Sequence, residues 1–220
     1  MKLLETIRFE NDGFENLDYH QHRMNRSRKM LFRREDEIDL NKYFFKSSFR
    51  ITNPEERINE LSSSGFAIPM QGKQYIFKCR IIYTEQIEKT EFLPYQRPKI
   101  RTLKIVADDE IDYLHKFLDR KPIEKLVAKK GGCDDILIVK NGLITDTSFA
   151  NILFFNGKEW ITPALPLLKG TQRARLLDEE KIRPADIRPE DLRYFRKARL
   201  INAMICFGDE VDIPVENIKP

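Results

Sequence analysis

Cysteine is scarce in this chain of 220 residues, which contains three. Cys79, Cys133 and Cys206 lie far apart, and no two of them form a Cys-x-x-Cys pair. A zinc ribbon or a disulfide framework requires cysteines in paired spacings, so the sequence supports neither. We therefore expect reduced thiols and a cytoplasmic protein.

Long apolar runs are also missing. A membrane helix needs about 20 consecutive apolar residues, and Glu5 and Arg8 interrupt the short apolar stretch at the N-terminus, so we expect neither a membrane span nor a signal peptide. The net charge of +4 is small against 39 basic and 35 acidic residues, which are spread along the chain. We expect no nucleic acid and no membrane as partner.

Several common site motifs are absent as well. The chain has no Gly-x-Gly-x-x-Gly, no Walker A loop, no Gly-x-Ser-x-Gly and no His-Glu-x-x-His. His20 and His22 could form a metal pair on one side of a strand. No cysteine or carboxylate cluster stands at ligand spacing, so we expect no metal. These patterns alone predict an α+β protein but do not name its function.

Strand and helix patterns occur in both halves of the chain, which predicts an α+β fold in two lobes, residues 1–98 and 99–220. Residues 91–99 contain two prolines and no strong periodicity, so they are the predicted linker. Met24 and either Met30 or Leu31 are expected to face inward from a helix. The expected elements of the first lobe are a strand over LLETIRF, helices over 20–32 and 54–61, and a strand over 74–83.

The second lobe has a more regular pattern. Two Asn-Gly pairs, at 141–142 and 156–157, each stand between apolar runs and predict hairpins with type I′ turns. Gly131 and Gly132 are expected to end a helix over 122–130. A strand over 100–106 and a helix that follows Gly170 complete the prediction.

Four separated segments resemble, in the same order, motifs of the class IV aminotransferases, which are fold-type IV pyridoxal-phosphate enzymes. The segments are LLETIRF with YHQHRM, IDYLHKFLDR, DDILIVKNGLITDTSFAN and PLLKGTQRARLL. They cover nearly the whole chain, and four ordered matches are much harder to attribute to chance than one. The resemblance implies a two-lobed D-amino-acid-aminotransferase-like architecture, pyridoxal 5′-phosphate as cofactor, and a homodimer.

The resemblance places Lys116 where the family has the lysine that holds the cofactor. Such a lysine must be desolvated or lie near another cation, so that a neutral amine is available. Asp146 stands where the family usually has glutamate, whose carboxylate keeps a proton on the pyridine nitrogen. Aspartate is one methylene shorter. The alternative interpretations are a solvated surface lysine and a turn residue at the end of a hairpin.

Phosphate ligands are implied at two places. Gly170, Thr171 and Gln172 stand at a predicted helix N-terminus, where backbone N–H groups and the helix dipole favour an anion. Gln172 replaces the threonine of many relatives. Arg23, from the His-x-x-Arg element, would pair with phosphate oxygens, and Asn202 would complete the phosphate site. The alternatives are an ordinary glycine turn and a solvated arginine.

Thr6 bears on the choice of reaction. Branched-chain aminotransferases tend to read Phe-Glu-Gly-Ile-Arg in the first strand, whereas lyases of the family tend to have threonine in place of the glycine; this chain reads LETIR. A hydroxyl there can relay a proton, although threonine is also common in strands. The resemblance thus implies a 4-amino-4-deoxychorismate lyase of folate synthesis, with Lys116 as the base. Candidate ligands of the substrate carboxylates are Arg80, Arg97 and Arg101.

Two alternatives remain open. The first is a branched-chain or D-amino-acid aminotransferase on the same scaffold. The second is a homologue without catalytic activity, which the departures at Asp146 and Gln172 favour. Met1 also stands close to the first matching strand, whereas lyases of the family usually have another strand before it.

Overall fold

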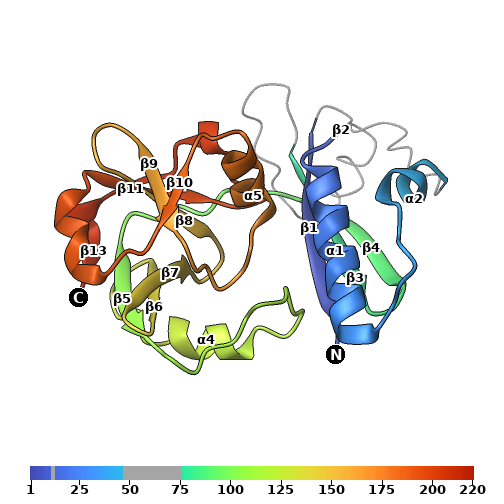
Figure 1. The fold of residues 1–220 in the computed structure, drawn as a ribbon, viewed down its shortest axis with the longest axis horizontal. Helices are drawn as coiled ribbons and strands as arrows, with labels where there is room; N and C mark the ends of the chain where they lie inside the picture. Colours follow the sequence, from blue (N-terminus) through green and yellow to red (C-terminus); the bar gives the residue numbers. More distant parts are fainter. Residues whose placement is uncertain (11–12, 47–75) are drawn as a thin grey trace, which may run out of the picture. The chain divides into compact units, whose positions relative to one another are not determined.

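The computed structural model describes residues 1–10, 13–46 and 76–220, which form two compact units (Figure 1). The first unit contains Leu3–Gln96 and the second Arg97–Pro220. The division follows Gln96, whereas the sequence suggests one after residue 98. Among the described residues, no helix combines the length and the apolar character needed to cross a membrane.

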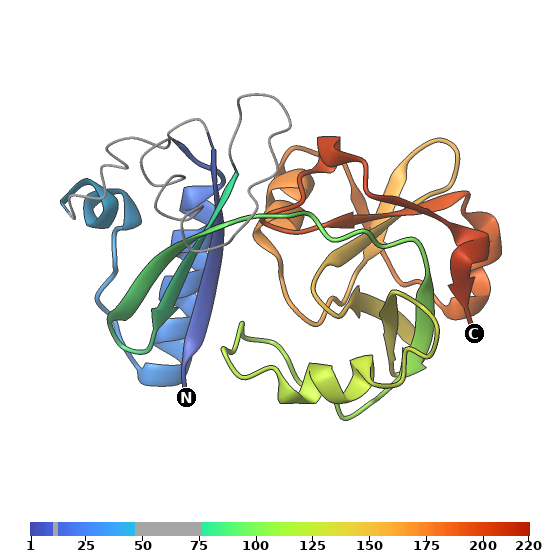
Figure 2. The same cartoon turned by 180° about the vertical axis from the view of Figure 1, so that it is seen from behind.

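The first unit is a four-stranded antiparallel sheet in the order β2-β1-β3-β4, with helix α1 along one face (Figures 1 and 2). The predicted first strand and helix are both present, and the helix begins at Leu17, three residues before the predicted start. The elements of this unit are β1 (Leu3–Glu10), β2 (Gly13–Phe14), α1 (Leu17–Phe32), α2 (Leu40–Lys46), β3 (Phe77–Tyr83) and β4 (Ile87–Pro94).

The pleat of β1 determines which side chains can meet α1. Successive side chains of a strand point to opposite faces, and Leu3, Glu5 and Ile7 are fully buried on one of them. Thr6, between Glu5 and Ile7, is half-buried on the other face, opposite Arg80 of β3 in the strand register. Glu5 and Thr6 therefore act on different sides of the sheet.

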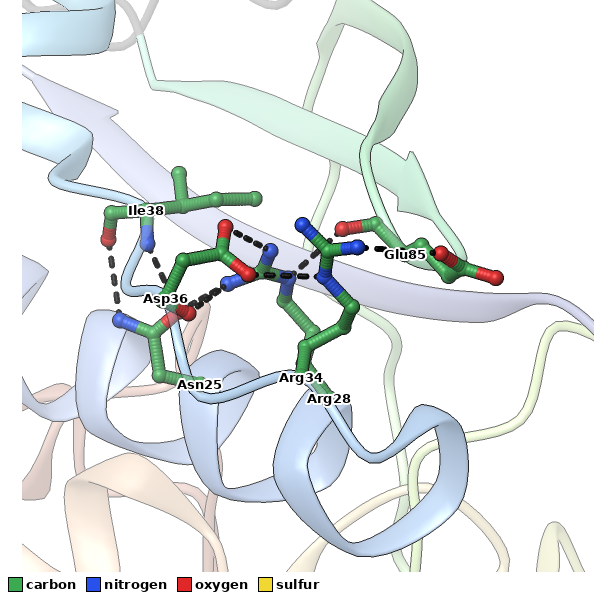
Figure 3. A network of polar contacts seen from close by, with 6 residues as sticks. All are labelled: Asn25, Arg28, Arg34, Asp36, Ile38 and Glu85. Carbon is green, nitrogen blue, oxygen red and sulfur yellow. Dashed lines mark hydrogen bonds and ion pairs between the residues drawn. The ribbon is translucent and has the colours of Figure 1, made fainter.

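A buried arginine attaches the end of α1 to the rest of the first unit (Figure 3). Arg28 is fully buried, and its Nε donates to the carbonyl of Glu85 at 2.8 Å. Its other nitrogens donate to Asn25 Oδ1, at 3.1 Å, and to the carbonyl and carboxylate of Asp36, at 2.7 and 2.8 Å. A buried charge needs such partners. The burial of Arg28 is therefore explained by its role in the fold, without a bound ligand.

The second unit contains a nine-stranded mixed sheet. The main path runs β10-β9-β8-β7-β6-β5-β13, and β11 pairs with β8 and with β12. Its strands are β5 (Leu103–Ala107), β6 (Asp135–Lys140), β7 (Leu143–Thr147), β8 (Asn151–Phe155), β9 (Trp160–Pro163), β10 (Arg183–Ala185), β11 (Lys197–Ile201), β12 (Asp212–Pro214) and β13 (Ile218–Lys219). Its α-helices are α4 (Lys121–Val127) and α5 (Thr171–Asp178), and its 3-10 helices are Pro189–Tyr194, Phe207–Asp209 and Val215–Asn217.

Two apolar clusters fix the helices of the second unit to its sheet. Ile123 and Leu126 of α4 pack with Ile136 and Ile138 of β6, as an amphipathic helix does on a sheet. Leu176 of α5 packs with residues of β8 and β11. The sheet thus supports both the segment that leads into α4, which contains Lys116, and the turn that leads into α5, which contains Gly170.

Several expectations from the sequence are wrong in detail. The predicted linker over 91–99 overlaps β4, an edge strand in which Pro94 is tolerated because it is the last residue. Met24 is buried in α1, as predicted, but of the two alternatives for the second inward position Met30 is 57% exposed and Leu31 is half-buried.

The turns and helix ends also differ in part. Asn141 and Gly142 both have positive φ, as a type I′ turn requires, whereas in the second hairpin positive φ occurs at Gly157 and not at Asn156. Asn156 instead accepts hydrogen bonds from the Lys158 and Glu159 backbones. Helix α4 ends at Val127, earlier than predicted. The helix predicted over 54–61 lies outside the described residues.

Candidate cofactor site

Lys116 lies in the irregular segment between β5 and α4, and its side chain is half-buried. Hydrogen bonds fix this segment on both sides of the lysine. The Tyr113 hydroxyl donates to the Phe117 carbonyl at 2.9 Å, and Arg120 Nη2 donates to the Ser148 carbonyl at 2.6 Å. Arg120 thus connects the lysine segment to the turn between β7 and β8, directly after Asp146 and Thr147.

Asp146, near the end of β7, is a buried carboxyl group, with 5% of the residue exposed. Oδ1 accepts a hydrogen bond from Asn151 Nδ2 at 2.7 Å, and Oδ2 accepts one from the Leu168 backbone N–H at 2.9 Å. Burial raises the pKa of Asp146 from 3.8 to about 6, although these two donors and the charge of Arg173 oppose the shift. The carboxylate lacks a cation as direct partner among the described residues.

This pKa predicts how the stability of the cofactor-free protein depends on pH. A carboxyl group whose folded-state pKa is raised stabilises the fold below its unfolded pKa, and this contribution is lost as the pH rises through the folded pKa. From pH 4 to pH 7, Asp146 should therefore lower the free energy of unfolding by about 2 kcal/mol. Urea unfolding of the apo protein should show this loss in the wild type but not in Asp146→Asn. Parallel pH profiles for the two proteins would contradict the assignment.

Gly170 is the N-cap residue of α5, and its backbone lies very close to the side chain of Asn151. Its backbone is extended, with φ −69° and ψ 146°, and no side chain caps the helix. A Cβ atom on Gly170 would lie 2.0 Å from Asn151 Oδ1. Only glycine fits this position, and the reason is the contact with Asn151 and not the dihedral angles. Thr171 and Gln172 follow in the first turn, and both are buried.

Asn202 follows β11 and stabilises its own turn. Its Oδ1 accepts hydrogen bonds from the Met204 and Ile205 backbones, at 2.8 and 2.9 Å. Its Nδ2 donates to the Phe149 carbonyl at 3.2 Å. Asn202 therefore contacts the loop between Asp146 and Asn151, but its side-chain oxygen is already used within the protein.

Arg23 belongs to the first unit, where it forms a buried cluster with Glu5 and His20. Arg23 Nε and Nη2 donate to the two oxygens of Glu5 at 2.9 and 2.5 Å. His20 Nδ1 lies 2.6 Å from Glu5 Oε2. Burial alone would raise the pKa of Glu5, but the charge of Arg23 and the two hydrogen-bonding partners outweigh it and lower the pKa from 4.5 to about 2. His20, considered above as a metal ligand, thus binds Glu5.

This cluster predicts a stability effect of opposite sign to that of Asp146. A lowered folded-state pKa stabilises the fold above the unfolded pKa, and the contribution is lost as the pH falls toward 2. Glu5→Gln should lower the free energy of unfolding at pH 7 by about 3 kcal/mol, and less at pH 3. Glu35→Gln, which removes an exposed ion pair with Lys29, is the matched control and should have a much smaller effect, because solvent screens that pair. Equal effects of the two substitutions at pH 7 would contradict the prediction.

The three arginines proposed to bind substrate have different surroundings. Arg80 lies beside Thr6 in the sheet register, and its Nη1 is 2.6 Å from Glu91 Oε1. Arg97 forms an ion pair with Asp209 at 2.7 Å. Arg101 is exposed, and its backbone N–H donates to Asp134. Arg80 is thus the one of the three that shares a sheet face with Thr6.

Sequence reasoning did not single out Glu5 or Asn151 as site residues. Both belong to the matching motifs, but their contacts cross between elements: Glu5 reaches α1, and Asn151 reaches Asp146 and Leu168. A polar residue at an inward position of a strand, between Leu3 and Ile7, was the available signal for Glu5. Among the residues that the structure describes, no three His, Cys, Asp or Glu side chains gather as a metal site would require.

These residues fit a cofactor with an anionic end and a basic ring nitrogen. The deeply buried Asp146 can accept a hydrogen bond from a protonated ring nitrogen, which would supply the cation that the carboxylate lacks. The N-terminus of α5, with glycine at its cap, suits a phosphate group. A lysine in a segment tied to the Asp146 hairpin completes the set that a pyridoxal-phosphate enzyme requires.

Comparison with known protein families and sequences identifies the family. The model for the amino-transferase class IV family matches residues 80–208. A Haemophilus influenzae protein, named "Uncharacterized protein", is 38% identical over 202 residues, which are 92% of this chain and 97% of that protein. The chain therefore belongs to the class IV aminotransferase family. Pyridoxal 5′-phosphate is the cofactor of this family, in agreement with the residues at the site.

Solved structures agree with this assignment. A crystal structure from Haemophilus somnus 129pt, named "putative 4-amino-4-deoxychorismate lyase", is 35% identical, with a TM-score of 0.73 over 94% of this chain and 97% of that one. An aminotransferase from Brucella abortus bound to the co-factor PLP is 18% identical, with a TM-score of 0.66 over 99% of this chain and 81% of that one. At that identity the second likeness concerns the fold alone. The fold is thus the α+β fold-type IV architecture.

Proposed function

We propose that the chain is a pyridoxal-phosphate-dependent 4-amino-4-deoxychorismate lyase, which forms 4-aminobenzoate and pyruvate. The observation that carries the proposal is Thr6, half-buried on the sheet face opposite α1 and beside Arg80. A hydroxyl in this position distinguishes the lyase pattern from the glycine of branched-chain aminotransferases. The name of the Haemophilus somnus relative supports the same reaction.

Each residue has a distinct task in this proposal. Bound pyridoxal phosphate supplies an electron sink next to the substrate's amino-bearing carbon. Lys116 would hold the cofactor, and its amine would act as the base that removes the proton from the amino-bearing carbon of the substrate. Thr6 relays or orients a proton. The electrons of the broken C–H bond complete an aromatic ring as the C–O bond to the enolpyruvyl group breaks, and the released enolpyruvate takes up a proton to become pyruvate.

The remaining residues hold the ligands in place. Asp146 keeps the proton on the ring nitrogen, while Gly170, Thr171 and Gln172 offer backbone N–H groups to the phosphate. Arg23 is a second phosphate ligand whose guanidinium is oriented by Glu5. Arg80 is the preferred ligand for a substrate carboxylate, which would share the guanidinium with Glu91.

The assembly and the compartment belong to the same proposal. The resemblance to the family implies a homodimer, and we propose a homodimer here. Cys79, Cys133 and Cys206 form no disulfide in the structure, which supports a reducing compartment such as the cytoplasm.

The test is an assay that separates the two candidate reactions. Purified enzyme saturated with pyridoxal 5′-phosphate is given 4-amino-4-deoxychorismate in one reaction, and an amino donor with a branched-chain 2-oxo acid in another. We expect 4-aminobenzoate and pyruvate in equal amounts from the first, and slow or no amination in the second. Amination without any 4-aminobenzoate would replace the lyase with an aminotransferase.

Substitutions at Thr6 make the assay specific for the proposed residue. Thr6→Ser keeps the hydroxyl and should retain most of the activity. Thr6→Val keeps the shape and the strand propensity but removes the hydroxyl, so turnover should fall by about 10²-fold. Equal turnover in the Ser and Val variants would show that the hydroxyl has no part in the reaction.

A further inference from the structure

Asn151 connects two segments that are far apart in the sequence. It begins β8 and lies opposite Asp146 of β7 in the strand register. The two hydrogens of its Nδ2 have separate acceptors: Asp146 Oδ1 at 2.7 Å and the Leu168 carbonyl at 2.9 Å. The residue is 5% exposed, so water does not compete for these bonds.

Leu168 is held from both sides by this pair of residues. Its N–H donates to Asp146 Oδ2 at 2.9 Å, and its carbonyl accepts from Asn151 Nδ2. Two residues later, Gly170 approaches Asn151 Oδ1 so closely that a Cβ atom there would lie 2.0 Å from it. Every polar atom of the Asn151 side chain therefore faces either Asp146 or the turn that leads into α5.

We propose that Asn151 is a positioning residue that fixes the distance between the carboxylate for the ring nitrogen and the turn for the phosphate. Its hydrogen bonds are to Asp146 and to the turn before α5, within the protein. It joins these two parts of the protein into one hydrogen-bonded unit, so that a ligand with both a ring nitrogen and a phosphate meets two aligned contacts. The inference rests on the cofactor site of the proposed function, and not on which reaction that site performs.

The chemistry of the position requires an amide. Aspartate there could not donate to the Leu168 carbonyl and would place a second carboxylate against Asp146. Leucine would fill the space but leave the Leu168 carbonyl and one Asp146 oxygen without donors. Serine is too short to reach both acceptors.

The experiment compares pyridoxal 5′-phosphate with pyridoxal, which has the ring nitrogen but no phosphate. Dissociation constants for both are measured by absorbance titration in the wild type, Asn151→Ala and Asn151→Ser, together with the melting temperature of each apo protein. Pyridoxal 5′-phosphate should bind more tightly than pyridoxal because of its phosphate. This gain in affinity requires that the protein groups for the ring nitrogen and for the phosphate are correctly aligned. We expect this gain to fall by about 10- to 100-fold in both variants, while affinity for pyridoxal changes much less.

Thr145→Val is the matched control. Thr145 is a buried residue of the same strand as Asp146, and its hydroxyl donates to the Ile138 carbonyl outside the Asn151 network. The control should lower the melting temperature without changing the ratio of the two dissociation constants. An unchanged ratio in Asn151→Ser or Asn151→Ala, or an equal change in Thr145→Val, would overturn the proposal. Failure of the lyase assay would leave this result unaffected, because it measures binding.

Discussion

Lys116→Ala is expected to lower turnover by at least about a thousandfold, because it removes both the covalent attachment of the cofactor and the base. The segment that carries Lys116 is fixed by the hydrogen bonds of Tyr113 to the Phe117 carbonyl and of Arg120 to the Ser148 carbonyl, which do not use the lysine side chain. The variant should therefore fold normally. Steady-state rates of 4-aminobenzoate formation measure the effect.

Lys125→Ala provides the control for this substitution. Lys125 lies on the exposed side of α4, close to Lys116 in the sequence, and its removal should leave turnover within about twofold of the wild type. If Lys116→Ala retained more than a tenth of the wild-type rate, Lys116 could not be the base.

Gly170→Ala is expected to weaken the binding of pyridoxal 5′-phosphate by about 10- to 100-fold. The added methyl group would lie 2.0 Å from Asn151 Oδ1, so the α5 turn or Asn151 must move. Overpacking of this kind typically costs about 1–3 kcal/mol, which corresponds to that loss of affinity if the strain falls on the binding conformation. Absorbance titration of the apo protein measures it.

Gly132→Ala and the double variant Asn151→Ala/Gly170→Ala sharpen this prediction. Gly132 has open space around its Cα and no positive φ, so alanine there should have no effect on cofactor binding. Because the clash in Gly170→Ala involves Asn151, the methyl group should cost less when Asn151 is already alanine. If the losses of cofactor affinity in the two single variants simply added in the double variant, the effect of Gly170→Ala would not come from the clash with Asn151.

The sequence predicts the second unit better than the first. Asn141-Gly142 favours a type I′ turn, and the apolar runs on both sides of it predict a hairpin, which β6 and β7 form. Strand β4 was not predicted because its exposed positions carry polar residues and Pro94 ends it. An edge strand buries too little of its surface to show a regular apolar pattern.

Contacts within the site were harder to predict than the residues themselves. Lys116, Asp146 and Gly170 follow from short motifs, since each requires one residue type at one place. Asn151 stands in such a motif, yet its importance depends on Leu168, 17 positions away. Glu5 likewise binds Arg23 across a strand and a helix, with 18 positions between them. Short local sequence patterns do not predict contacts between residues that are so far apart in the chain.

The most direct test of the cofactor site is to map the residue that is covalently modified. Purified protein with pyridoxal 5′-phosphate should absorb near ~410–430 nm, and borohydride should remove this band by fixing the cofactor to its lysine. Peptide mass spectrometry then identifies the modified residue. We expect a single phosphopyridoxyl group on Lys116, and we expect Asp146→Asn to be labelled at the same residue. A label on another lysine, such as Lys169 beside Gly170, or no band at all, would contradict this expectation.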